Sequence, residues 1–271
     1  MDARAIGVFD SGMGGLTTVR ELIYRLPGED VIYFGDTGRV PYGSKGAETV
    51  VKYARQDVAF LRTFDLKAIV IACGTVSTTA LEVLTRENPL PIIGVVEPAA
   101  RAAVYATKTG RIGLVGTKTT IASGAYERTL RQLMPQVQVT ARACPLFVPL
   151  VENGRYQPDD PLVKMVVAEY LEPFRAAKVD TLVLGCTHYP LLWEAIADYL
   201  GPEVTLISSG AACVDTVAQL LEERDMRNPK NQGGRRQYFA SDSAADFSAL
   251  GSIFLGEDIQ GQAEQIAIER Y

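Results

Sequence analysis

Two cysteines in the sequence have the surroundings expected of acid–base catalysts. Cys73 follows the apolar run at residues 69–72, Cys186 follows the run at residues 182–185, and a threonine lies close behind each. An apolar run that ends in small residues is typical of a buried parallel strand that leads into a helix. The free N–H groups and the dipole of a helix start favour a thiolate. Two thiols presented in this way could serve as base and acid on opposite sides of one carbon atom, as inversion at that carbon requires.

The other two cysteines, Cys144 and Cys213, carry no such context, and we interpret them as small core residues. The spacing of the four cysteines contains no C-x-x-C pair and no zinc-ligand pattern with His188, the only histidine. We therefore expect free thiols in a reducing compartment and no metal site.

The elements that position the two cysteines alternate between strand-like and helix-like patterns. Helical spacing is clear at residues 49–64, where Val50, Ala54, Val58 and Leu61 recur on one face. Such alternation predicts βαβ units and parallel sheets. The expected strands are residues 6–9, 31–34, 69–72, 92–95, 112–115, 137–141, 182–184 and 204–207. The proline-rich stretch 144–161 is expected to be a loop with a short helical turn.

The chain also contains a weak internal repeat. Residues 6–12 and 112–118 are similar, and in each half a strand that ends in a cysteine follows roughly seventy residues later. This repeat favours two similar α/β domains that face each other across a cleft. One doubly wound sheet of eight strands is the alternative that the pattern leaves open.

The glycine-rich segment at residues 11–15 follows a strand and begins a helical pattern, so its backbone N–H groups can bind an anion. Neither phosphate-binding fingerprint, G-x-x-x-x-G-K-[ST] or G-x-G-x-x-G, is present, which favours a carboxylate over a nucleotide. Thr75 and Thr187 can offer hydroxyl or backbone donors to a second carboxylate, although either threonine alone would be interpreted as a helix cap.

The composition is that of an ordinary globular protein. The chain has 271 residues, of which 47% are hydrophobic, and a formal net charge of −5. Nucleic acid is not expected as a partner, because phosphate binding needs clustered positive charge. A membrane partner is not expected either, because no run approaches the length of a membrane span and no signal peptide is evident, so we expect a cytoplasmic location.

Five short motifs in order resemble the bacterial glutamate racemases, from Ile6 to about Leu255: Asp10-Ser11-Gly12, Gly35-Asp36, Pro41-Tyr42-Gly43, Ala72-Cys73 with Thr75, and Gly185-Cys186-Thr187-His188. The resemblance implies two similar three-layer α/β domains with mainly parallel sheets, a pseudo-twofold relation and an active site in the cleft between them. The expected division is residues 1–97 plus 208–271 for the first domain and residues 98–207 for the second.

The resemblance further implies a cofactor-independent racemase that interconverts L- and D-glutamate, supplies D-glutamate for peptidoglycan and forms a homodimer. Cys73 would take the α-proton from D-glutamate and Cys186 from L-glutamate, assisted by Asp10 and His188. Ser11, Tyr42 and Gly43 would surround the γ-carboxylate, and Glu152 would lie near the histidine. The complete set of expected substrate-binding residues is Ser11, Asp36, Pro41, Tyr42, Gly43, Gly74, Thr75, Thr117, Thr187 and Glu152.

One position departs from the family pattern, which usually has Asn after the first catalytic cysteine where this chain has Gly74. We expect a water molecule or a hydroxyl of Ser77 or Thr117 to replace the lost contact, so that Gly74→Asn has at most about a tenfold effect on KM. Two other functions remain open at this point. One is an aspartate or other amino-acid racemase of the same superfamily, and the other is a binding module for dicarboxylates or proteins without catalysis.

Overall fold

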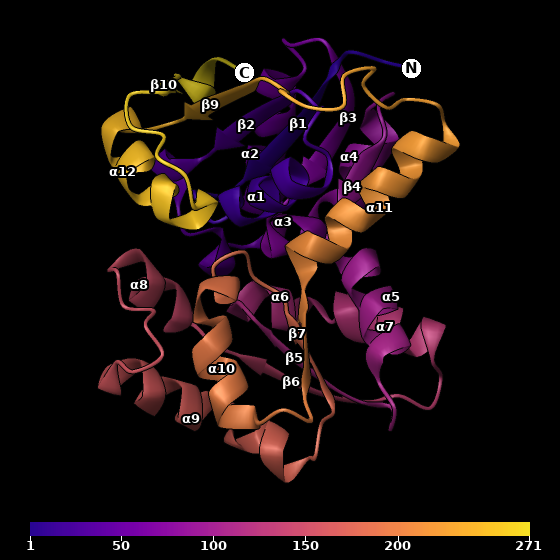
Figure 1. Cartoon of the computed structure of the whole chain (residues 1–271), viewed down its shortest axis with the longest axis vertical. Helices are drawn as coiled ribbons and strands as arrows, with labels where there is room; N and C mark the ends of the chain where they lie inside the picture. Colours follow the sequence, from indigo (N-terminus) through magenta and orange to yellow (C-terminus); the bar gives the residue numbers. More distant parts are fainter.

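The computed structural model describes residues 1–271 and contains two parallel sheets (Figure 1). The strand order of the first sheet is β10-β9-β2-β1-β3-β4, and that of the second is β6-β5-β7-β8. The first sheet is formed by β1 (Ala5–Asp10), β2 (Val31–Gly35), β3 (Leu66–Ile71), β4 (Ile92–Gly94), β9 (Arg236–Ala240) and β10 (Ala263–Gln265). The second sheet is formed by β5 (Arg111–Gly116), β6 (Gln138–Ala143), β7 (Thr181–Leu184) and β8 (Thr205–Ser208).

The eight strands expected from the sequence are all present, in two sheets and not in one. The order β2-β1-β3-β4 in the first sheet repeats as β6-β5-β7-β8 in the second, so the internal repeat corresponds to a repeated topology. The predicted two-domain α/β fold is confirmed. Strands β9 and β10 were not predicted, and they extend the first sheet beyond β2.

Twelve α-helices surround the sheets: α1 (Leu16–Arg25), α2 (Ala47–Leu61), α3 (Gly74–Thr79), α4 (Leu81–Glu87), α5 (Val96–Ala106), α6 (Lys118–Ser123), α7 (Ala125–Leu133), α8 (Phe147–Glu152), α9 (Pro161–Ala176), α10 (Trp193–Leu200), α11 (Ser209–Glu223) and α12 (Ala244–Leu255). Short 3₁₀ helices occupy η1 (Thr37–Arg39), η2 (Tyr42–Ser44), η3 (Tyr189–Leu192) and η4 (Ile268–Arg270). No helix combines the length and apolar character needed to span a membrane.

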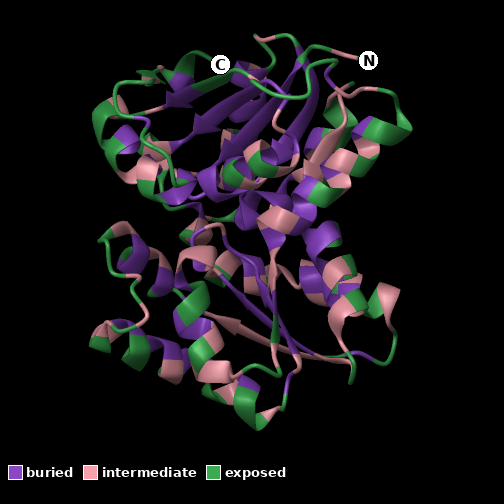
Figure 2. Ribbon diagram, in the orientation of Figure 1, coloured by how far each residue is buried: buried purple, intermediate pink, exposed green.

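Alternating side chains of each strand pack into different layers, because successive residues of a strand point to opposite faces. In β1, Ile6 and Val8 belong to a buried cluster with side chains of α1, α11 and α12, whereas Phe9 belongs to a cluster with those of α2 and α4. In the second sheet, Val183 packs with α5 and α7, and Leu182 packs with α9 and α10. Each sheet is therefore the middle of three layers, and the first sheet is buried more completely than the second, whose edge strands β6 and β8 are partly exposed (Figure 2).

The chain connects the two domains through α5 and α11. Helix α11 begins directly after β8 of the second sheet, runs up beside the first domain and packs on both α1 and α5 (Figure 1). The segment after α11 then adds β9 and β10 to the first sheet. The predicted boundary at residues 97 and 98 falls inside α5, and the residue bounds of the domain division stay a prediction.

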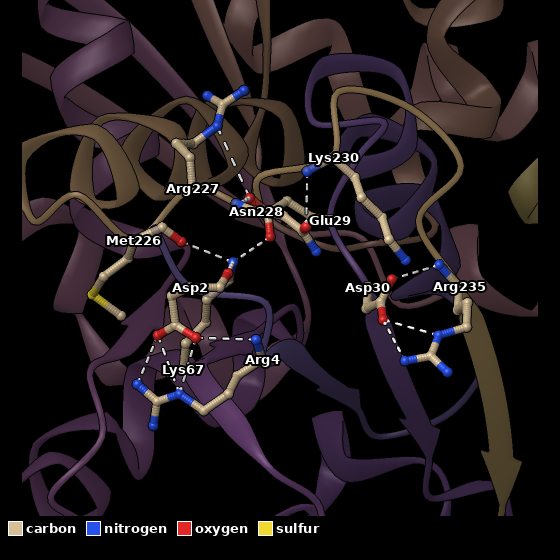
Figure 3. A network of polar contacts seen from close by, with 10 residues as sticks. All are labelled: Asp2, Arg4, Glu29, Asp30, Lys67, Met226, Arg227, Asn228, Lys230 and Arg235. Atoms are coloured by element: carbon tan, nitrogen blue, oxygen red, sulfur yellow. Dashed lines mark hydrogen bonds and ion pairs between the residues drawn. The ribbon is translucent and has the colours of Figure 1, made fainter.

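A buried polar network holds the returning segment at the amino ends of β2 and β3 (Figure 3). Lys67 is fully buried, pairs with Glu29, and donates 2.8 Å hydrogen bonds to the carbonyl oxygens of Asp2 and Met226. Arg235 pairs with Asp30 at 3.1 Å. Because a buried charge is stable only when it is paired and hydrogen-bonded, this network fixes the segment that leads into β9.

Candidate active site

A cavity of about 280 Å³ lies between the two domains, at the carboxyl ends of the central strands of both sheets. Its volume is at the small end of the range for ligand sites in proteins. Two predicted site residues, Asp10 and Asp36, do not line it. The predicted site residues that do line it are Ser11, Pro41, Tyr42, Gly43, Cys73, Gly74, Thr75, Thr117, Glu152, Cys186, Thr187 and His188.

Cys73 lies between β3 and α3, at the N-cap position of that helix. Its Sγ donates a hydrogen bond to Ser11 Oγ at 3.5 Å. Burial raises the pKa of the Cys73 thiol to about 12, and the nearby Asp10 carboxylate raises it as well, while Ser11 and the Val76 N–H act in the opposite sense. The effect of the helix start is thus outweighed, and the site holds Cys73 as a thiol at neutral pH.

Asp10, the last residue of β1, is buried beneath the cavity wall. Its Oδ2 accepts a hydrogen bond from the Gly12 N–H at 3.1 Å, and its buried Oδ1 has no hydrogen-bond partner. Burial raises the pKa of this carboxyl, and the charge of His188 opposes that shift. Asp10 therefore influences the pKa of Cys73 through its charge, although it does not line the cavity.

Cys186 has a cationic neighbour. His188 Nδ1 lies 3.9 Å from Cys186 Sγ, and His188 Nε2 lies 3.0 Å from Glu152 Oε1. Burial lowers the pKa of the imidazole, but the hydrogen bonds to Cys186 and Glu152 outweigh it and raise this pKa to about 10. His188 therefore carries a proton at neutral pH, and its charge can stabilise a thiolate at Cys186.

The prediction that Cys186 lies at a helix start is wrong. Strand β7 ends at Leu184, a turn follows, and the first helical residues are those of η3, which begins at Tyr189. The positive charge beside Cys186 thus comes from the imidazolium of His188 and not from helix N–H groups. The prediction of a helix start holds for Cys73 alone.

Threonine hydroxyls connect the two domains across the cavity. Thr75 Oγ1 of the first domain lies 3.1 Å from Thr117 Oγ1 of the second, and Thr117 Oγ1 donates to Thr120 Oγ1 at 3.0 Å. On the Cys186 side, Thr187 Oγ1 lies 3.4 Å from His188 Nδ1. These hydroxyls provide donors and acceptors for a polar ligand between the two thiols.

Asp36 lies behind the cavity wall, in a buried carboxyl cluster with Asp57. Its carboxylate accepts hydrogen bonds from Arg39 at 2.6 Å, from Ser241 at 2.7 Å and from the Tyr42 hydroxyl. The expected ligand contact of Asp36 is therefore not found, because its oxygens bind these three side chains. For the same reason the Tyr42 hydroxyl points away from the cavity, so this residue can offer a ligand only its backbone.

Among the residues near the site that were not predicted, three bring charge or contacts between the domains. Lys118 lines the cavity directly after Thr117 and brings a positive charge that suits a carboxylate. Phe254 of α12 packs edge-on against the His188 ring, with 5.1 Å between ring centroids, and Thr17 donates to the Thr187 carbonyl at 3.0 Å. The position of Lys118 shortly after a predicted strand could have indicated that it lies near the cavity. Nothing in the sequence indicated that Phe254 or Thr17 would reach the other domain.

Comparison with known proteins gives a consistent result over nearly the whole chain. The model of the Asp/Glu/hydantoin racemase family matches residues 15–217. A glutamate racemase of Geobacter metallireducens is 46% identical over 99% of this chain and 98% of its own length. The crystal structure of a Bacillus anthracis glutamate racemase isoform superposes with a TM-score of 0.93 at 37% identity, covering 98% of both chains. That of the Francisella tularensis glutamate racemase in complex with D-glutamate superposes with a TM-score of 0.91 at 34% identity, covering 100% of both chains.

Proposed function

The chain belongs to the Asp/Glu/hydantoin racemase family, within it to the glutamate racemases, and from this we propose that it interconverts L- and D-glutamate by a cofactor-independent two-thiol mechanism. The observation that carries the proposal is one cavity lined by two free cysteines from corresponding strand ends of the two domains. Each thiol has its own proton-active partner, Asp10 for Cys73 and His188 for Cys186. A binding module would need neither reactive thiols nor such partners.

The geometry suggests how L-glutamate would react. A Cys186 thiolate, stabilised by the His188 imidazolium, removes the α-proton, and the electron pair of the Cα–H bond delocalises into the α-carboxylate. Cys73, held as a thiol, then donates its proton to the opposite face of the same carbon, which yields D-glutamate. After this turnover Cys186 carries the proton and Cys73 is the thiolate, so the reverse reaction uses the same groups with their roles exchanged.

Hydroxyl and backbone groups would hold the two carboxylates and the ammonium group of the substrate. The hydroxyls of Thr75, Thr117 and Thr187 are placed for the amino-acid end, where negative charge develops during proton removal. Ser11 and the backbone at Gly43 are placed for the γ-carboxylate, and Lys118 supports this end by its charge. Pro41, Gly74 and Glu152 complete the wall of the same cavity.

We further expect the reaction to supply D-glutamate for peptidoglycan in the cytoplasm, with the protein acting as a homodimer, as its resemblance to bacterial glutamate racemases implies. Gel filtration coupled to light scattering checks the homodimer: a mass near 58.8 kDa, twice the 29.4 kDa of the chain, is expected, and a mass of one chain would refute it.

The activity is tested by incubating the purified protein with L-glutamate in the absence of pyridoxal phosphate and by following D-glutamate with chiral chromatography. L-Aspartate and other amino acids are run in parallel. Aspartate is one methylene shorter and would leave buried donors unpaired, so kcat/KM for glutamate should exceed that for aspartate by at least about tenfold. Equal or reversed values would favour the aspartate racemase, and binding of glutamate without any turnover would favour the binding module.

A further inference from the structure

The residues next to the two catalytic cysteines touch each other across the cavity. Gly74 follows Cys73 in the first domain, and Gly185 precedes Cys186 in the second. A Cβ atom at position 74 would overlap with the carbonyl oxygen of Gly185, at a separation that Cβ atoms do not adopt. Its next neighbours would be the carbonyl carbon of Gly185 at 3.4 Å and Thr120 Oγ1 at 3.6 Å, both in the second domain.

This contact joins two backbones, so no side-chain rotation could relieve an overlap there. Gly185 is anchored within its own domain, because its N–H donates to the Val115 carbonyl at 2.8 Å at the end of β5. On the other side, Gly74 is the first residue of α3 and is separated from the end of β3 by only two residues. An added Cβ would therefore have to move one domain relative to the other, and the two thiols would move with them.

A second close approach supports the same geometry at an independent position. A Cβ atom at Gly14, which precedes α1 of the first domain, would overlap with Thr187 Oγ1 and with the His188 ring. At Gly14 and Gly74 the facing residues of the second domain belong to the segment around Cys186.

We propose that the backbone contact between Gly74 and Gly185 fixes the separation of the two thiols, which makes Gly74 a positioning residue for inversion. The proposal rests on the proposed two-thiol reaction. An alanine at position 74 would hold the domains apart, so that one thiol could still remove the α-proton while the other would be too far from the opposite face to return one. Reprotonation would then come from the first thiol, with retention of configuration.

The contact also corrects our expectation for Gly74→Asn. The sequence predicts at most about a tenfold effect on KM, because it indicates only a substrate contact at this position. Asn carries a Cβ atom as Ala does, so both substitutions should disturb the approach of the two domains. The resemblance implies Asn at this position in most glutamate racemases, so we infer that the two domains approach each other more closely at Gly74 in this chain.

The first test needs no substrate and uses the four free cysteines. Wild type, Gly74→Ala and the control Gly46→Ala, at a glycine with no atom near its added Cβ, are treated with iodoacetamide, and each cysteine is followed by peptide mass spectrometry. In Gly74→Ala, Cys73 and Cys186 should react at least about threefold faster, because alkylation depends on access to the thiol. Cys144 and Cys213 should keep their wild-type rates.

Two outcomes of this experiment would overturn the proposal. Unchanged rates at Cys73 and Cys186 would mean that position 74 does not hold the domains apart. A rise at all four cysteines together would mean that the variant loses its fold, because Cys144 and Cys213 are fully buried in the domain cores. Gly74 would then be needed for folding and not for the separation of the thiols.

The second test compares exchange with inversion for L-glutamate in deuterated water. In Gly74→Ala, kcat for racemisation should fall by about a hundredfold, since a misplacement of about 1 Å has effects of this size. In wild type the remaining L-glutamate should at first keep its protium, whereas in Gly74→Ala it should gain deuterium with retention of configuration, so the ratio of exchange to inversion should rise. An unchanged ratio of exchange to inversion, relative to wild type and Gly46→Ala, would refute the proposal. Absence of both reactions in wild type would instead refute the proposed function. The alkylation result would still show whether Gly74 sets the separation of the two domains.

Discussion

The two halves of the site share one scaffold but differ in their charges. Cys73 and Cys186 follow strands at equivalent places of the orders β2-β1-β3-β4 and β6-β5-β7-β8. Around Cys73, burial and the Asp10 carboxylate raise the pKa of the thiol to about 12. Around Cys186, a histidine with its pKa raised to about 10 brings positive charge. The repeated topology thus places two thiols symmetrically, while the neighbouring side chains bring a carboxylate to Cys73 and an imidazolium to Cys186.

This difference shows how a symmetric fold can start a reaction in one defined state. In the mechanism proposed above, a free protein with Cys73 as a thiol and Cys186 beside an imidazolium would accept L-glutamate. To accept D-glutamate, it would have to exchange the protonation states of the two cysteines. The comparison predicts that substitutions around Cys73 and around Cys186 will change the isotope effects for the two enantiomers in opposite directions.

The largest effect is expected from removing either thiol. Cys73→Ala and Cys186→Ala should each lower the racemisation rate by at least about a hundredfold, because a positioned acid or base contributes this much or more and each turnover needs both. Chiral chromatography of glutamate measures the loss. Cys144→Ala, which removes a buried thiol outside the cavity, is the matched control and should stay near wild type. Near wild-type racemisation by Cys186→Ala would contradict the mechanism.

Replacing the partner of each thiol should reveal the asymmetry. His188→Asn and Asp10→Asn should each lower kcat by roughly tenfold to a hundredfold, since each weakens one proton transfer while both thiols remain. In His188→Asn, the step at Cys186 becomes slower, so the deuterium isotope effect on kcat/KM should rise for α-deuterated L-glutamate and fall for the D-enantiomer.

Asp10→Asn should give the mirror-image pattern, with the larger isotope effect for α-deuterated D-glutamate. Because the equilibrium constant is one, kcat/KM must stay equal in the two directions. The two variants can therefore be told apart by their isotope effects and not by their rates. If both variants changed the isotope effects of the two enantiomers equally, the assignment of one partner to each thiol would be wrong.

The charge of His188 should also appear in the pH dependence of stability. The folded protein raises the pKa of His188 from the reference value of 6.5 to about 10. The contribution of His188 to the free energy of unfolding is therefore fully present below pH 6.5 and is lost as the pH rises through 10. Between pH 7 and 9, the difference in free energy of unfolding between wild type and His188→Asn should shrink by up to about 1.4 kcal/mol per pH unit. Urea denaturation at several pH values measures it, and a difference that does not change with pH would show that His188 is neutral.

The smallest effect is expected at Glu152, whose side chain is 37% exposed. Glu152→Gln keeps a hydrogen bond to His188 Nε2 and removes only a partly solvent-screened charge, so kcat should fall by less than about tenfold. Steady-state kinetics in both directions provide the test. A loss as large as that of His188→Asn would mean that Glu152 takes part in the proton transfer itself.

Most of the fold could be predicted because the central strands β1, β2, β3, β5 and β7 are almost fully buried and strongly apolar. Strands β9 and β10 could not, since β9 begins with exposed polar residues and β10 has only three residues at the edge of the sheet. Their pairing depends on the position of β2 and on the buried network around Lys67, which joins segments far apart in the sequence.

The sequence predicted which residues form the site better than it predicted their charges and pKa values. The strand-end pattern placed both cysteines in one cavity, but the raised pKa of Cys73 depends on burial beside Asp10, which spacing does not reveal. The sequence did contain one signal against a helix start at Cys186. Pro190 favours the first turn of a helix, and η3 indeed begins at Tyr189. Nothing in the sequence indicated that Asp36 would bind Arg39, Tyr42 and Ser241 instead of a ligand.

The most direct test of the account is the early time course of deuterium uptake during racemisation in deuterated water. Each enantiomer is incubated separately with the wild-type protein, and the α-hydrogen content of the product and of the remaining substrate is measured by mass spectrometry after chiral separation. Two thiols on opposite faces predict that the first product formed carries solvent deuterium while the remaining substrate keeps its protium. A product that retains the protium of its substrate would show that one base serves both faces and would contradict the account.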